Sequence, residues 1–264
     1  QDVSSPYECY AGLIFNLACT ASPKFYQKNP IETMKSNVLG AINILNIAEK
    51  NNCRIFHAST SEVYGDPKEF PQKETYLGNV NPNGVRSCYD EGKRAAESIF
   101  MDYYRTRYIK IKIARIFNVY GPKMRSDDGR LISNLVIQAL KNQPMTIYGD
   151  GSQTRSLCYI DDLLDGILNL MDTPDDVTGP VNLGNPDERS VLEIAGIIKD
   201  ITQSKSPIEF RPLPQDDPKR RCPDISLASS ILNWKPNVDL RTGIAKTVDY
   251  YRMNSANVTF QIDQ

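Results

Sequence analysis

The sequence predicts an α/β protein in which helices cover a parallel sheet, with a smaller α+β lobe in the C-terminal half. Three observations support this fold class. Short apolar runs alternate with long helical patterns between residues 13 and 116, which is the rhythm of βαβ units. The elements after residue 122 are shorter and more mixed. The chain has 264 residues, 40% of them hydrophobic and 24% charged, which suits one large domain or two lobes that share a core.

The first half contains the clearest elements. Leu13–Ala18 is an apolar run that ends in small residues, as in a buried parallel strand. Residues 31–50 carry apolar side chains at helical spacing, and residues 89–107 form a second long helical pattern. Further strands are expected at 54–59 and 110–116. Between them lies a long proline-containing loop, 60–86, and loops of that length are often functional.

The second half is predicted to hold more and shorter elements. Helices are expected at 131–142, 161–171, 191–202, 225–232 and 240–251, and strands at 145–148, 181–184 and 208–211. Asp161 is expected to cap the helix that follows it. We assign residues 1–122 and 155–185 to the sheet domain, and residues 123–154 and 186–264 to the lobe that receives a substrate.

Charge and composition narrow the function. The net charge is −1, from 31 basic and 32 acidic residues, so neither a nucleic acid nor an anionic membrane is an expected partner. No apolar run approaches the ~20 residues of a membrane span, and no secretory signal pattern is seen. The six cysteines lack a Cys-x-x-Cys motif and His57 is the single histidine, so no metal site is expected. Free thiols indicate a reducing cytoplasm.

Tyr89 and Lys93 are four residues apart and therefore share one face of a helix. A Tyr of ordinary pKa, about 10, is a poor base at neutral pH, but a nearby Lys cation favours the phenolate. Such a pair can accept a proton from an alcohol while a cofactor accepts the hydride. The same spacing also fits the ordinary start of an amphipathic helix, so the pair alone leaves both interpretations open.

Two neighbouring motifs favour the catalytic interpretation. Ser59-Thr60-Ser61-Glu62-Val63-Tyr64-Gly65 precedes the pair, and Ala114-Arg115-Ile116-Phe117-Asn118-Val119-Tyr120-Gly121-Pro122 follows it. In this order the three segments resemble the extended short-chain dehydrogenases/reductases that act on nucleotide sugars. Segments 60–67, 81–97 and 127–130 are most similar to the UDP-glucuronate decarboxylases. The chain departs from them at Cys19-Thr20, Val119 and Lys123.

The resemblance implies a Rossmann-type domain, NAD as cofactor and a UDP-sugar as substrate. The implied reaction is decarboxylation of UDP-glucuronate to UDP-xylose through a 4-keto intermediate. A nucleotide-sugar 4,6-dehydratase, a 4-epimerase and a cofactor-free pseudoenzyme or structural subunit remain alternatives. None of the 15 glycines forms a Gly-x-Gly-x-x-Gly motif. By the resemblance, Gln1 follows the third strand of the sheet, and the Gly-rich turn belongs before it.

The resemblance also assigns roles to single residues. The catalytic group comprises Tyr89, Lys93, Thr60, Ser61, Glu62 and Arg155. The cofactor-binding group comprises Leu17, Ala18, Asn37, Ser59, Tyr89, Lys93 and Arg115. The substrate-binding group comprises Ser22, Lys35, Asn118, Arg130, Tyr148 and Arg221.

Structural roles compete with several of these assignments. Thr60 and Ser61 are also plausible as turn residues at a strand end, Arg155 as a partner of a nearby Asp, and Tyr148 as a core side chain. Assembly is predicted as well. Helices 31–50 and 89–107 have more apolar positions than one sheet face needs. In the resembling family, the equivalent helices pair with their copies, so a homodimer through these helices is expected.

Overall fold

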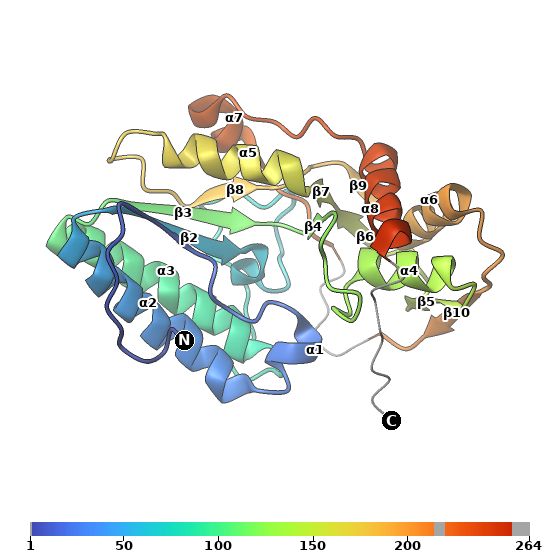
Figure 1. The fold of residues 1–264 in the computed structure, drawn as a ribbon, viewed down its shortest axis with the longest axis horizontal. Coiled ribbons are helices and arrows are strands. Elements are labelled where there is room, and N and C mark those ends of the chain that lie inside the picture. Colours follow the sequence, from blue (N-terminus) through green and yellow to red (C-terminus); the bar gives the residue numbers. More distant parts are fainter. Residues whose placement is uncertain (1, 214–219, 255–264) are drawn as a thin grey trace.

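The computed structural model describes residues 2–213 and 220–254. Figure 1 shows two groups of elements side by side, a layered sheet with long helices and a smaller group of short strands and helices. The four-stranded sheet consists of β1 (Leu13–Asn16), β2 (Arg54–Thr60), β3 (Ile111–Ile116) and β8 (Val181–Leu183). Its order is β1-β2-β3-β8 and every pairing is parallel, which confirms the predicted α/β class.

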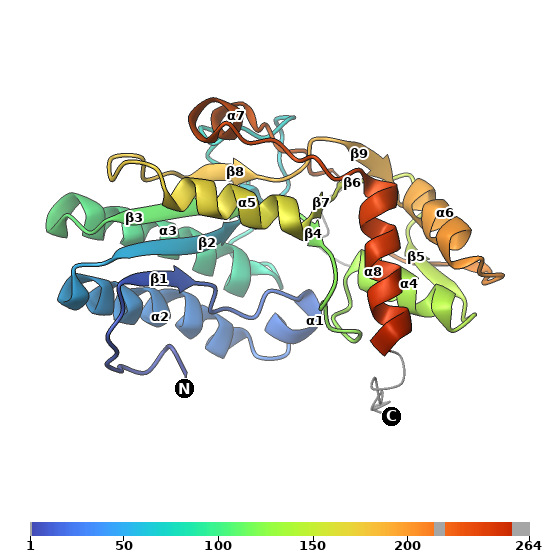
Figure 2. The same cartoon turned by 45° about the horizontal axis from the view of Figure 1, so that its top comes forward.

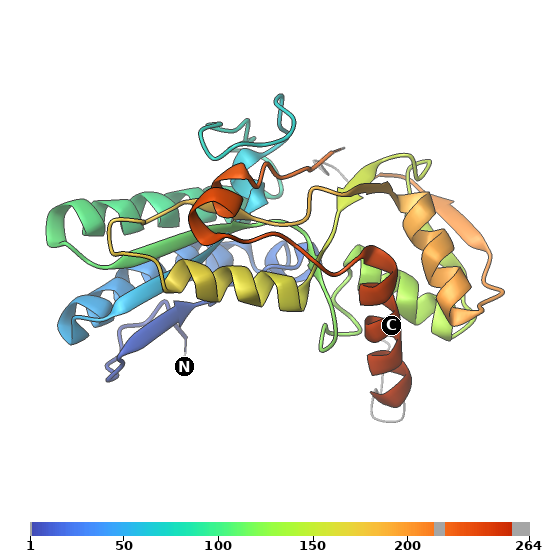
Figure 3. The ribbon, with the colours of Figure 1, turned by 90° about the horizontal axis from the view of Figure 1, so that it is seen from above.

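Helices cover both faces of this sheet (Figures 2 and 3). Helices α2 (Pro30–Asn51) and α3 (Ser87–Arg107) pack on one face, and α5 (Ile160–Met171) and α7 (Ser226–Leu232) pack on the other. Successive strand residues alternate between the two cores, so Ile55 contacts the α2–α3 cluster and Phe56 the α5–α7 cluster. This alternation explains the uninterrupted apolar runs that predicted the strands.

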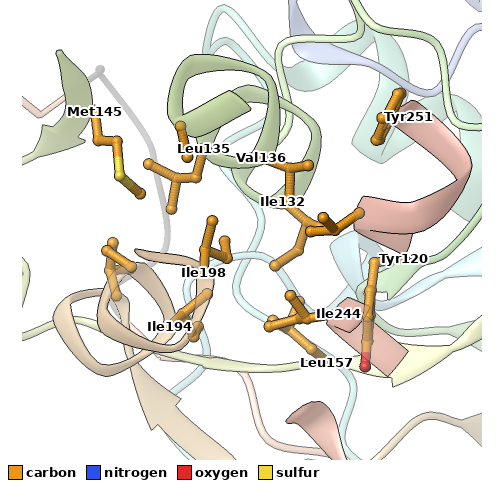
Figure 4. Packing of buried hydrophobic residues seen from close by; sticks show 14 of the residues in the cluster. Tyr120, Ile132, Leu135, Val136, Met145, Leu157, Ile194, Ile198, Ile244 and Tyr251 are labelled. Atoms are coloured by element: carbon orange, nitrogen blue, oxygen red, sulfur yellow. The ribbon is translucent and has the colours of Figure 1, made fainter. Parts of the chain in front are cut away.

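The smaller lobe has its own core, part of which Figure 4 shows. Its helices are α4 (Leu131–Leu140), α6 (Val191–Thr202) and α8 (Leu240–Asn254), and its parallel strand pair is β5 (Met145–Tyr148) with β10 (Ile208–Arg211). Ile132 and Leu135 of α4 lie against Ile194 and Ile198 of α6, while Ile244 comes from α8. Ser190 and Glu193 form a capping box that fixes the start of α6.

Several short elements join the two groups. They are the helix α1 (Pro23–Tyr26), the 3₁₀ helix η1 (Ser61–Tyr64), and the strands β4 (Val119–Tyr120), β6 (Thr154–Ser156), β7 (Cys158–Tyr159) and β9 (Glu188–Ser190). Strand β4 pairs with β7 in parallel, and β6 pairs with β9 in antiparallel. These strands contain only two or three residues and were not anticipated, because so short a segment has no detectable periodicity.

The predicted elements agree with the structure to within a few residues, with two differences. Asp161 does not cap α5, because Tyr159 occupies the N-cap position and Asp161 lies in the first turn. Helix α7 lies within the range 186–264 that the sequence assigned to the lobe, but it packs on the sheet side. Its Ala228 and Leu232 join Leu183 of β8 in one apolar cluster.

The long loop 60–86 is held close to the sheet. Gly65 adopts a φ of 65°, and a Cβ there would lie 2.1 Å from the backbone oxygen of Asn79. Only glycine fits this close approach. The backbone amide of Asp66 donates to the oxygen of Asn79, and the amide of Asn79 donates to the oxygen of Tyr64. These bonds fix the turn that carries Ser61 and Glu62.

A second anchor of the loop is Gln72, which is 1% exposed. Its backbone amide donates to the oxygen of Cys222, and its side-chain Oε1 accepts from the amide of Cys222 at 2.9 Å. Its backbone oxygen accepts from the amide of Asp224 and from the side chain of Asn182. Segment 220–224 is therefore bound to the loop through its backbone, next to β8.

Near the amino end of β3, a buried lysine binds the connection between α5 and β8. Lys112 of β3 has no exposed surface, and its Nζ donates to Thr173 Oγ1 at 2.8 Å, Pro174 O at 2.5 Å and Val177 O at 2.7 Å. These three oxygens belong to the connection between α5 and β8. One ammonium group thus donates hydrogen bonds to three oxygens of a partly buried turn.

Replacement of Lys112 by Met is expected to destabilise the fold, because the buried oxygens lose their donor. The free energy of unfolding should fall by about 1–3 kcal/mol in urea titrations. The matched control is Lys110→Met, since Lys110 forms only an exposed pair with Asp175. The control should change stability by less than about 0.5 kcal/mol. Equal stability of the two variants would contradict the assigned role of Lys112.

Candidate active site

Tyr89 and Lys93 lie in the first two turns of α3, beside the carboxyl end of β2. Both side chains are buried, at 6% and 4% exposure. Lys93 Nζ lies 5.9 Å from the centre of the Tyr89 ring and donates to the backbone oxygen of Ala58 at 2.9 Å. The Tyr89 phenol shares a hydrogen bond with the side chain of Thr60. The strand end and the helix start therefore bring the phenol, hydroxyl and ammonium groups together.

The electrostatics of this pair differ from the expectation. Burial raises the pKa of Tyr89, although the hydrogen bond from Thr60 and the charge of Arg130 act in the opposite direction. Burial also lowers the pKa of Lys93. The prediction that Lys93 lowers the pKa of Tyr89 is thus not met in this structure. Helical spacing places two groups on one face, but it contains no information on how deeply both are desolvated.

Glu62 joins three separate segments of the chain. Its Oε2 accepts from the guanidinium of Arg86 at 2.7 Å and from that of Arg221 at 2.6 Å. Burial by itself raises the pKa of a carboxyl group, but the charges of Arg221 and Arg86 outweigh it and the pKa of Glu62 is lowered. Arg155 of β6 contributes to the same lowering. Glu62 is therefore a fixed anion near Tyr89.

Two further polar side chains border this anion. Asp90 follows Tyr89 on α3, is 8% exposed, and has a pKa raised to about 7 by burial and by the like charge of Glu62. Tyr26 of α1 stacks on the Tyr89 ring with centroids 4.9 Å apart and planes 7° apart. Its hydroxyl is buried without a hydrogen-bond partner among the described residues. Helix α1 thus lies against Tyr89, which together with Lys93 forms the reacting pair.

On the other side of Lys93, Asn37 of α2 is 3% exposed. Its amide nitrogen donates to Thr33 O at 3.0 Å, while its Oδ1 is buried and finds no partner within residues 2–213 and 220–254. A Cβ on Gly92 would lie 3.0 Å from that amide nitrogen, so glycine permits this close packing of α2 and α3. Asn37 therefore presents an acceptor near Cys19, whose pKa it acts to lower.

The other predicted cofactor residues have varied surroundings. Leu17 and Ala18 directly follow β1, and Leu17 is 62% exposed. Ser59 of β2 donates to Glu97 Oε1. Arg115 of β3 makes a two-bond pair with Glu97 at 3.0 and 2.7 Å and also donates to Tyr64. Ser59 and Arg115 thus belong to one structural network around Glu97.

Two of the predicted substrate residues are linked through Asp128. Ser22 Oγ donates to the backbone oxygen of Asp128 at 2.5 Å, which connects the loop before α1 to the segment before α4. Arg130 is the N-cap residue of α4, pairs with Asp128 at 3.1 Å and is close enough to Tyr89 to lower its pKa. Of these two residues, Arg130 is the one that acts on Tyr89.

The remaining predicted residues make separate contacts or are exposed. Arg155 donates to the backbone oxygen of Thr154 at 2.8 Å. Asn118 accepts through its backbone from Cys158, which links β4 and β7. Tyr148 ends β5 and is 41% exposed, so it is not a core residue. Lys35 forms an exposed pair with Glu32 at 2.9 Å on α2.

Comparison with known proteins places this site in a family. A profile of the family described as GDP-mannose 4,6 dehydratase matches residues 8–247. The chain belongs to this family of extended short-chain dehydrogenases/reductases. Among curated relatives, UDP-glucuronic acid decarboxylase 1 of Arabidopsis thaliana is 51% identical over 97% of the chain and 59% of its own length. UDP-glucuronic acid decarboxylase 3 of the same plant is 48% identical over 96% of the chain and 73% of its own length.

A solved structure supports the fold of this family. UDP-glucuronic acid 4-epimerase from Bacillus cereus, in complex with UDP-glucuronic acid and NAD, matches with a TM-score of 0.83 and 28% identity. The match covers 92% of the chain and 76% of the epimerase. The match confirms the Rossmann-type assignment. The chain spans less than two thirds of the length of the first three Arabidopsis decarboxylases, with shares of 59%, 56% and 56%.

Three site residues were not singled out by sequence reasoning, and two of them, Arg86 and Asp90, lie within the motif that contains Tyr89. Arg86 binds Glu62, Asp90 borders it, and Tyr26 stacks on Tyr89. Arg86 and Asp90 flank Tyr89 in the motif and are one helical turn apart, a spacing that does signal a shared face. Tyr26 had no comparable signal, because it contacts Tyr89 across a gap of more than sixty residues.

Within residues 2–213 and 220–254, no three or more His, Cys, Asp or Glu side chains are grouped so that they could hold a metal ion. In the same part of the chain, no helix is both long and apolar enough to cross a membrane.

Proposed function

We propose that the protein catalyses the NAD-dependent decarboxylation of UDP-glucuronate to UDP-xylose through a 4-keto intermediate. The observation that carries the proposal is the juxtaposition of two functional units. The hydrogen-bonded Tyr89 and Thr60 form a proton-accepting unit, and the ionised Glu62, held by Arg86 and Arg221, forms a charged unit beside it. Its relatives named UDP-glucuronic acid decarboxylases, at 46–51% identity, support the same reaction.

The residues present fit NAD. The unpaired Oδ1 of Asn37 is a buried acceptor, and Lys93 is an ammonium fixed by Ala58 O next to it. We propose that these two side chains and the backbone of Leu17 and Ala18 hold the nicotinamide end. NAD, when bound, supplies the hydride acceptor for the C4–H bond and a positive charge that favours the Tyr89 phenolate. The solved epimerase that the chain resembles contains NAD.

Tyr89 is the proposed base for the 4-hydroxyl of the sugar. Thr60 orients that hydroxyl, because its own side chain already bonds the Tyr89 phenol. Stacking on Tyr26 fixes the plane of the phenol. Loss of the hydroxyl proton to Tyr89 accompanies oxidation at C4, which makes a carbonyl β to the C6 carboxylate.

Decarboxylation then follows from the chemistry of a β-keto acid. The C5–C6 bond breaks, CO2 leaves, and the electron pair enters an enolate that must be stabilised and protonated at C5. C4 would then regain the hydride from the reduced cofactor, and Tyr89 would return its proton to the 4-oxygen, which gives the 4-hydroxyl of UDP-xylose. Glu62, Ser61 and Arg155 are the proposed groups around the ring. Arg155 supplies the positive charge for the enolate oxygen, and the fixed anion Glu62 keeps that charge near it. Burial excludes water, which strengthens these interactions.

Arg221 and Arg130 are the proposed partners of the diphosphate. Arg221 uses one terminal nitrogen on Glu62, while its buried Nε finds no acceptor within the described ranges. A guanidinium with an unused donor suits a phosphate oxygen. Asn118, Ser22, Lys35 and Tyr148 are proposed as further substrate contacts. In this proposal, residues 1–122 and 155–185 bind NAD, and residues 123–154 and 186–264 bind the nucleotide sugar.

Tyr89→Phe tests the proposal most directly, because it removes the base before oxidation. In full-length protein with NAD and UDP-glucuronate, product formation measured by mass spectrometry should fall by at least 10²-fold. Tyr64→Phe is the matched control, since Tyr64 is a buried Tyr that bonds Asn182 rather than the reacting pair. Conversion of UDP-glucuronate to an isomer of equal mass, without loss of CO2, would instead establish a 4-epimerase.

Arg155→Ala and Arg221→Ala should separate catalysis from binding. Loss of Arg155 removes charge stabilisation from the enolate, so turnover should fall by about 10²–10³ while UDP affinity changes little. Loss of Arg221 removes a phosphate contact, so UDP affinity should fall more strongly. Turnover and calorimetric UDP affinity are measured for each variant. Normal turnover of Arg155→Ala would remove it from the mechanism.

We further propose a homodimer through α2 and α3. In support of this dimer, Leu39 on the outer face of α2 is 43% exposed, and Ile42 nearby is half-buried. Helix α3 adds Ile99 and Tyr103, which are also half-buried. Tyr103 bonds Asn46 at 2.8 Å, which aligns the outer faces of the two helices. A cytoplasmic location is also proposed, since all six cysteines are free thiols. Cell fractionation would test the location.

Leu39→Asp should convert the dimer into a monomer, because it buries a carboxylate in the proposed apolar contact. Light scattering of full-length protein at micromolar concentration measures the mass. Leu168→Asp is the matched control, since Leu168 is 53% exposed on α5 across the sheet. A monomeric parent protein, or a dimer that persists in Leu39→Asp, would refute this interface.

A further inference from the structure

Several buried charged side chains surround Glu62. Two carboxylates, Glu62 and Asp90, face two guanidiniums, Arg86 and Arg221. The exposures of these four residues are all between 7% and 8%. The charges of the four groups therefore balance when both carboxylates are ionised. Arg155 lies close enough to act on Glu62 as a further positive group.

Hydrogen bonds are distributed unevenly within this set. Both guanidiniums donate to the same oxygen, Oε2 of Glu62. The Oδ1 atom of Asp90, the hydroxyl of Tyr26 and the Nε of Arg221 are buried with no hydrogen-bond partner in the part of the chain that the structure describes. Buried polar atoms are normally paired, so these three atoms point to a ligand. A carboxyl that carries a proton can both donate and accept here.

When the ligand is an anion, the charges near Glu62 and Asp90 determine which of the two carboxyl groups is protonated first. The diphosphate of a UDP-sugar adds negative charge beside Arg221, and a negative charge raises the pKa of nearby carboxyl groups. Glu62 is shielded by two direct guanidinium bonds. Asp90 accepts no such guanidinium bond within the described residues, and burial together with the charge of Glu62 already raises its pKa to about 7. Of the two carboxylates, Asp90 is therefore the first to be protonated.

We propose that Asp90 is a positioning residue that takes up one proton when the diphosphate of a nucleotide sugar binds at Arg221. This inference rests on the proposed function. The chemical consequence is that the site already holds the one proton that decarboxylation consumes. Loss of CO2 from a carboxylate breaks the C5–C6 bond, leaves the electron pair on the sugar and consumes one proton at C5. The proton stored on Asp90, next to Tyr89 and Glu62, meets that need within the site.

The groups that face this carboxyl set the direction of the effect. On α3 these are Arg86 and Glu91, on η1 Glu62, and on the 220–224 segment Arg221. Tyr26 faces it from α1. The positive groups keep Asp90 ionised in the free protein above pH 7, and the bound anion offsets them. Binding should therefore weaken as the pH rises above 7, by up to about tenfold in Kd for each pH unit.

The experiment is calorimetry of full-length protein with UDP-xylose, a ligand that neither reacts by decarboxylation nor titrates near neutral pH. Titrations at pH 8 in Hepes and in Tris, which differ in ionisation enthalpy and contain no phosphate that could compete for Arg221, give the number of protons taken up. Parent protein should take up close to one proton. Asp90→Asn should still bind, with an uptake near zero and a Kd that no longer depends on pH. Asp102→Asn, the matched control on the same helix, should behave like the parent, because Asp102 forms an exposed pair with Arg105.

Each outcome decides the matter. Binding without proton uptake, or uptake that persists in Asp90→Asn, overturns the role of Asp90 but leaves the proposed function intact. Failure of the parent protein to bind UDP-xylose overturns the proposed function, and the inference with it. Because the Kd of the parent protein as a function of pH is measured without any substitution, the inference does not depend on the folding of a variant.

Discussion

The pairing of Glu62 with Arg86 and Arg221 is the constraint on which the rest of the site depends. It joins the turn after β2, the start of α3 and the segment before α7, which are separated by 24 and 159 residues. One carboxylate oxygen therefore organises three segments that no single element connects. Removal of one partner from such a buried pair leaves an uncompensated charge, which is strongly destabilising. Catalytic geometry and local stability thus depend on the same contacts.

The sheet provides the fixed frame for this pairing. The carboxyl end of β2 positions Thr60, Ser61 and Glu62, and the start of α3 positions Arg86, Tyr89 and Asp90. Ligand sites in open parallel sheets lie at the carboxyl ends of the strands, and this site follows that rule. Arg130 comes from the start of α4 in the smaller lobe, and Arg155 from β6, one of the short strands that join the two groups. The reacting pair is therefore built on the sheet side, and the charged groups around it come from several parts of the fold.

Sequence reasoning predicted the sheet and the long helices, because periodicity determines them, whereas the grouping of Thr60 with Tyr89 was implied by the family resemblance. It could not predict the bonds of Arg86 and Arg221 to Glu62, since these join segments far apart in the chain. The pKa of Tyr89 was predicted in the wrong direction for the same kind of reason. Spacing reports which side chains are neighbours, whereas the sign of a pKa shift depends on their burial.

The bonds of Gln72 to Cys222 and Asp224 have a consequence for which mutations the protein tolerates. Gln72 holds segment 220–224 through backbone groups as well as its side chain, so the position of Arg221 follows from the number of residues between Gly65 and Gln72. Exposed side chains in that interval are free to vary. Insertion or deletion of one residue, however, shifts the anchor and moves Arg221 away from Glu62. In this surface loop, the anchoring bonds constrain length more strongly than side-chain composition.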